Sequence, residues 1–116
     1  MNRERARQVL EESLGRGSNT PCTWAPDRAA YIAEYSDRLR QVLIDPVLVT
    51  VLRSAHDTDL LGRLSPCTVY ALARTENHWL LYIEEFKEFA LAFGSSEREL
   101  SVIGFSSDDA LAEWLG

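Results

Sequence analysis

The chain has 116 residues, of which 46% are hydrophobic and 26% charged, and its formal net charge is −6. This size and composition indicate one globular domain over residues 1–116. They argue against a membrane span, because no apolar run approaches about 18 residues, and against direct nucleic-acid binding, because an acidic surface repels phosphate.

The N-terminal stretch MNRERARQVLEES is charged and lacks the apolar core of a signal peptide. We therefore expect a cytoplasmic protein. Cys22 and Cys67 have no CxxC spacing, and in that compartment they are expected to be free thiols.

Two helices are predicted in the first half of the chain. Residues 3–14 carry apolar side chains at helical spacing, with Asn2 suited to cap the start and Gly15 to follow the end. After a loop at 15–23, a second helix is expected to begin near Pro26 and to continue to about residue 44 with a broad apolar stripe.

The middle of the chain is harder to assign. DPVLVTVLRSA (45–55) is compatible with a helix or a strand, and its β-branched residues favour a strand. HDTDLLGRL (56–64) predicts a short helical turn capped by Asp57.

From residue 68 the apolar period changes to two, which predicts strands. The turns at 75–77 and 94–98 are too short for anything but antiparallel neighbours, so we expect a four-stranded meander, or five strands if 46–53 joins it. The small side chains of Ala71, Ala73, Ala90 and Ala92 are expected to form a face on which a helix lies closely. Trp79 and its neighbours supply bulk on the other face.

FSSDDALAEWLG (105–116) predicts a C-terminal helix. Ser106 and Asp109 resemble a capping box, and Asp108 and Asp109 lie at the positive end of the helix dipole. The expected fold class is therefore α+β, with N-terminal helices packed on an antiparallel meander and one helix at the C-terminus.

The negative charge is concentrated in the second half of the chain. Residues 1–58 carry eight Arg against eight acids, whereas residues 59–116 carry four basic residues against ten acids. The acids form three groups, at residues 84–88, at residues 97–99 and at residues 108–109. In a meander, the first and third groups lie towards the same end of the sheet and the second lies at the opposite end.

This charge has two interpretations. Acids at strand ends can simply keep the edges soluble and unpaired. Alternatively, they form a surface for a basic protein partner, with Phe86 in EEFKE as an apolar anchor inside an acidic rim. The second interpretation gives the predicted partner-binding residues, which are Glu84, Glu85, Phe86, Glu88, Asp108 and Asp109.

No motif predicts catalysis. His56 and Asp57 could ligate a metal but lack further ligands, and Cys67 with His56 or His78 lacks any signature of a nucleophile. We therefore expect neither an enzyme nor a bound metal or cofactor.

The stretch from Val69 to Leu115 resembles the C-terminal half of small bacterial immunity proteins, the cytosolic inhibitors that neutralise toxins delivered between competing cells. Several such families are acidic, of this size, and end in a hairpin followed by a helix of the type found at 105–115. The resemblance implies a non-catalytic inhibitor that covers the active site or substrate groove of a toxin. Two alternatives remain open, a phage-encoded inhibitor of a nucleic-acid-binding defence complex and a homo-oligomeric module without catalytic activity.

Overall fold

The computed structural model describes residues 1–20, 22–54, 60–103 and 105–115, with the backbone alone for residues 53 and 54. It confirms the α+β class. The elements run in the order α1 (Arg3–Gly15), α2 (Arg28–Gln41), β1 (Leu43–Leu48), β2 (Val51–Ser54), α3 (Leu60–Leu64), β3 (Val69–Thr75), β4 (His78–Ile83), β5 (Glu88–Phe93), β6 (Leu100–Val102) and α4 (Ala110–Leu115).

The sheet has six strands in the order β1-β3-β4-β5-β6-β2. Strands β3 to β6 form the predicted antiparallel meander. The ambiguous segment after α2 forms two further strands, so the sheet is larger than the four or five strands expected. Strand β1 pairs antiparallel with β3, whereas β2 pairs parallel with β6 at the opposite edge.

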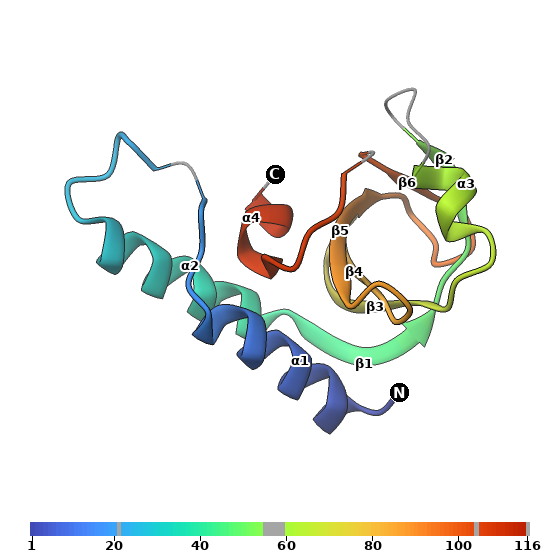
Figure 1. The fold of residues 1–116 in the computed structure, drawn as a ribbon, viewed down its shortest axis with the longest axis horizontal. Helices are drawn as coiled ribbons and strands as arrows, with labels where there is room; N and C mark the ends of the chain where they lie inside the picture. The colour runs from blue at the N-terminus through green and yellow to red at the C-terminus, as the bar shows by residue number, and fades with distance from the viewer. Residues whose placement is uncertain (21, 55–59, 104, 116) are drawn as a thin grey trace.

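Only Val49 and Thr50 connect these two edge strands. The link is itself held by hydrogen bonds: Val49 N–H donates to the Val69 carbonyl (3.1 Å) and Thr50 N–H to the Glu97 carbonyl (2.8 Å). Because so short a link joins opposite edges, the sheet curls around until those edges approach one another (Figure 1).

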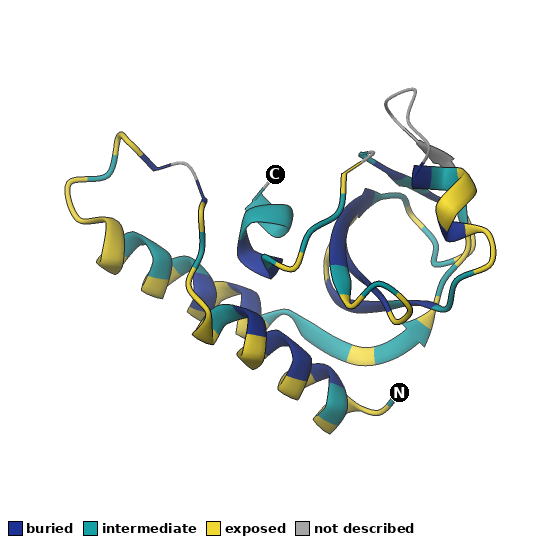
Figure 2. Ribbon diagram, in the orientation of Figure 1, coloured by how far each residue is buried: buried dark blue, intermediate teal, exposed yellow. Residues whose placement is uncertain are grey.

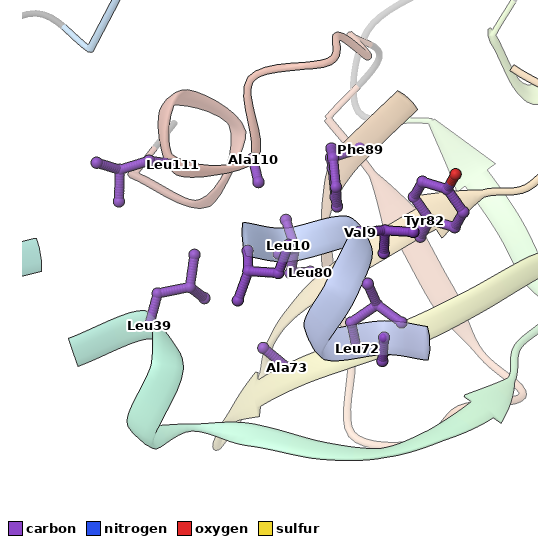
Figure 3. Packing of buried hydrophobic residues seen from close by; sticks show 11 residues of the cluster. Val9, Leu10, Leu39, Leu72, Ala73, Leu80, Tyr82, Phe89, Ala110 and Leu111 are labelled. Atoms are coloured by element: carbon purple, nitrogen blue, oxygen red, sulfur yellow. The ribbon is translucent and has the colours of Figure 1, made fainter. Parts of the chain in front are cut away.

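The two faces of the curled sheet bury separate hydrophobic clusters. On the outer face, side chains of β3, β4 and β5 pack against α1, α2 and α4 (Figure 3). The inner cluster combines residues of every strand with Leu60 and Leu64 of α3. As predicted, Trp79 and Leu81 share one face of β4 and Leu80 lies on the other.

The expectation that Ala71, Ala73, Ala90 and Ala92 share one helix-covered face is wrong for three of the four. Ala71, Ala90 and Ala92 belong to the inner cluster with Trp79, whereas α1, α2 and α4 lie on the outer face, where Ala73 alone of the four alanines is found. In the register of β4 and β5, Trp79 lies opposite Ala92 and Leu81 opposite Ala90. The interior of a tightly curled sheet has little volume, so each large side chain there needs a small partner.

The helices begin at side-chain caps. Asn2 Oδ1 accepts the Arg5 N–H (2.8 Å), and Asp27 Oδ1 accepts the Ala30 N–H (3.1 Å), so α2 starts just after Pro26. Along α2 only Ser36 and Leu39 are buried, and its N-terminal half projects from the body of the molecule (Figure 2). Among the described residues, no helix has both the length and the apolar composition needed to cross a bilayer.

Candidate interaction surface

A groove of ≈ 630 Å³ lies between α1, the β4–β5 turn and the segment that precedes α4. It brings together the first and third acidic groups, as predicted: Ser106 Oγ donates to Glu88 Oε1 (2.8 Å), and Phe89 forms a β-bridge with Ser107. The lining residues are Arg5, Val9, Glu12, Arg16, Tyr82, Phe86, Lys87, Glu88, Phe89, Ser107 and Asp108.

The β5–β6 turn, with Glu97 and Glu99, lies at the other end of the sheet. There the Gly94 N–H donates to the Asn77 carbonyl of the β3–β4 turn (3.0 Å). The predicted separation of the three acidic groups is therefore confirmed.

Within the β4–β5 turn, the acids have different surroundings. Glu84 and Glu85 are both exposed, but Glu85 Oε1 accepts the backbone N–H of Thr68 (2.7 Å). This hydrogen bond lowers the pKa of the Glu85 carboxyl, because it stabilises the ionised form. Glu85 and Glu88 thus hold the turn in place as well as carrying charge.

Phe86 is half-buried rather than the exposed anchor that its place in the sequence suggested. Its side chain packs against the inner cluster, and the Arg63 guanidinium lies over its ring at 4.7 Å from the centroid. A ring covered in this way offers a partner less apolar surface than an exposed anchor would.

Asp108 and Asp109 also differ from one another. The Asp108 side chain is 71% exposed, and its Oδ2 lies 3.9 Å from Arg16 Nε. Asp109 is the N-cap of α4, since its Oδ1 accepts the Ala112 N–H (3.0 Å), and it also accepts hydrogen bonds from Ser18 Oγ and the Asn19 N–H. The predicted capping box starting at Ser106 is therefore wrong by three residues.

Charge is balanced inside the groove but not around it. The lining contains three basic side chains, those of Arg5, Arg16 and Lys87, and an equal number of carboxylates. Of the ion pairs between described residues, four of five involve acids of residues 1–58, and Asp108 is the single acid of the second half that takes part. The negative excess of the second half therefore remains available at long range.

Two further titratable groups lie near these elements. Burial raises the pKa of the Glu113 carboxyl on α4, against the opposing effect of a hydrogen bond from Ser107, and Asp109 and Glu88 raise it further. Desolvation likewise raises the pKa of the Cys67 thiol, and the negative charge of Glu85 raises that pKa further. A thiol held protonated in this way is a poor nucleophile.

An aromatic surface on α2 was not predicted from the sequence. Trp24, just before the helix, is 68% exposed, and its ring meets Tyr31 edge-on with centroids 5.9 Å apart. Tyr31 in turn contacts Tyr35, with centroids 4.5 Å apart. The signal in the sequence is a Trp in a loop followed by tyrosines four residues apart, which lie within the apolar stripe predicted for this helix.

The metal and thiol sites considered in the sequence do not form a second candidate site among the described residues. His56 and Asp57 lie outside the described residues. Within the described ranges, no three His, Cys, Asp or Glu side chains gather closely enough to hold a metal ion, and Cys22 and Cys67 are free.

Comparison with protein-family models, curated proteins and solved structures gives no significant match to this chain.

Proposed function

We propose that this chain is an immunity protein, an inhibitor that binds a cognate bacterial toxin and blocks it through an acidic surface. The observation that carries the proposal is the negative excess of the second half, which ion pairs between described residues leave almost entirely unpaired. Such a surface attracts a basic partner and raises its association rate, by about 10- to 1000-fold at low ionic strength.

The surroundings of the six proposed binding residues divide them by role. Glu84 and Asp108 are exposed and are the proposed points of direct contact. The other three acids accept hydrogen bonds within the protein: Glu85 from Thr68, Glu88 from Ser106 and Asp109 from Ser18. We propose that they hold the acidic surface in shape, and that half-buried Phe86 supports the turn from beneath.

The function is tested by purifying the tagged chain from its native host and identifying the protein that accompanies it. That protein is then expressed in a second host with and without this chain. We expect it to arrest growth when alone and to be harmless in the presence of the chain. A co-purifying protein that is not toxic, or whose toxicity the chain does not relieve, would refute the proposal.

The acidic surface is tested separately with charge reversal. Glu84→Lys with Asp108→Lys spares the internally bonded acids, so folding should be retained. We expect the association rate with the captured toxin to fall about tenfold at low salt and to depend less on salt. The control, Glu76→Lys with Glu99→Lys, changes the net charge equally at the opposite end of the sheet. Equal losses in the two variants would show that total charge alone matters.

A further inference from the structure

The aromatic surface of α2 is defined here as Trp24, Tyr31 and Tyr35 with the carboxylates of Asp27 and Glu34. Tyr35 also packs against the outer hydrophobic cluster, whereas Trp24 is 68% exposed. Beside it lies a hollow of ≈ 410 Å³, lined by Ala25, Pro26, Asp27, Ala30, Tyr31 and Glu34. Exposing a Trp costs hydrophobic stabilisation, and exposed Trp and Tyr grouped together are typical of binding surfaces.

Hydrogen bonds from Arg28 of α2 hold the loop that carries Trp24 in place. The Arg28 guanidinium donates to the carbonyls of Ser18 (2.6 Å) and Thr20 (2.8 Å) and to Cys22 Sγ (3.0 Å). Asp109 accepts from the Ser18 hydroxyl on the same loop. A surface ordered before binding loses less conformational entropy when a partner arrives.

The charge around the hollow selects a cation. Two carboxylates, Asp27 and Glu34, line it, and none of the described residues that line it is basic. Aromatic faces attract guanidinium and ammonium groups as well. One turn further along, the protein already shows this chemistry: the Arg38 guanidinium lies 4.8 Å from the Tyr35 ring centroid and 3.2 Å from Glu34 Oε1.

We propose that the aromatic surface of α2 is a docking site for an arginine-bearing segment of another protein, whose guanidinium lies against Trp24 and Tyr31 and pairs with Asp27 and with the carboxylate that Glu34 already shares with Arg38. This site is remote in sequence from the acidic turn at residues 84–88. It does not depend on the proposed toxin, because it rests on the geometry of α2 and of the loop before it.

The probe is the peptide acetyl-Gly-Arg-Gly-Arg-Gly-amide, titrated into the ¹⁵N-labelled full chain. The indole N–H signal of Trp24, assigned with Trp24→Phe, should shift and saturate, while those of Trp79 and Trp114 stay in place. Asp27→Asn with Glu34→Gln should weaken binding about 3- to 10-fold, as expected for the loss of two surface ion pairs. Asn caps a helix as well as Asp does, so α2 is preserved.

Two controls make the result specific. The peptide with Glu in place of Arg should leave Trp24 unmoved. Glu4→Gln with Asp45→Asn removes the same charge away from the hollow and should bind as the wild type does. The proposal is overturned if Trp24 does not respond, if both double variants weaken binding equally, or if the Trp24 signal instead follows the protein's own concentration with a dimer seen in sedimentation. A failed toxin assay leaves this titration unaffected.

Discussion

At the scale of single residues, the two tryptophans of the C-terminal half have different surroundings. Trp79 is 1% exposed in the inner cluster, and its indole N–H donates to the Gly94 carbonyl (2.8 Å). Trp114 is half-buried at the margin of the outer cluster. From the sequence alone both tryptophans are expected in the core, because each lies on an apolar face of its predicted strand or helix. The alternation of a strand identifies an inward side chain more surely than the broad face of a short terminal helix does.

We expect Trp79→Ala to lower the free energy of unfolding by about 3–5 kcal/mol, because it leaves a large cavity and an unpaired carbonyl. Trp114→Ala should cost about 1–3 kcal/mol, since part of that ring is already in water. Urea denaturation followed by far-UV circular dichroism measures both. Equal losses would contradict the assignment of Trp79 to the centre of the sheet.

The raised pKa of Glu113 gives a pH prediction. The folded protein holds the proton on this carboxyl more tightly than the unfolded chain does, so its contribution to stability is full below the ordinary pKa of Glu and is lost as the pH rises through the raised value. Glu113→Gln should therefore raise the melting temperature at pH 7 and have little effect near pH 3. Glu84→Gln, at an exposed site, is the matched control.

At the scale of elements, the start of α4 is held by hydrogen bonds to residues that are far away in the sequence. Asp109 caps this helix and also fixes the loop before α2 through Ser18 and Asn19. From sequence alone Asp109 is one of two acids favoured by the helix dipole. Which acid caps and which is solvated depends on the long-range position of Ser18, and local patterns contain no information on it.

Asp109→Ala should lower the free energy of unfolding by about 2–3 kcal/mol, because a cap and a hydrogen-bonded loop are lost together. Asp108→Ala should cost less than about 1 kcal/mol, because only an exposed ion pair is removed. Thermal denaturation of the two variants decides between them, and a larger effect at Asp108 would invert the assigned roles.

The elements themselves were largely predictable. Period-two alternation in the strands between Val69 and Phe93 and short turns predict the meander, although a register shift between Ala71 and Ala73 interrupts the alternation in β3. The caps at Asn2 and Asp27 are local. The partner of β2 was not predictable, since parallel pairing with β6 joins residues 51–54 to residues 100–102. The candidate site divides in the same way. Composition revealed the acids, but their hydrogen bonds and the exposure of Trp24 depend on tertiary packing.

At the scale of the whole molecule, the link at Val49–Thr50 keeps the two edges of the sheet together. Inserting four Gly/Ser residues between them should lower the free energy of unfolding by about 1–3 kcal/mol, because the hydrogen bonds to Val69 and Glu97 would loosen. The same insertion between Ser95 and Ser96, in an exposed turn, should cost less than about 1 kcal/mol. Equal effects in urea denaturation would show that the link is not a structural constraint.

The pairing of β2 with β6 determines when the sheet can be completed during protein synthesis. Strand β2 is made before its neighbour β6, and the whole meander is translated between them. A nascent chain therefore exposes an unpaired edge until residues 100–102 have left the ribosome, and premature termination ahead of them yields a polypeptide that cannot finish its sheet and is open to aggregation.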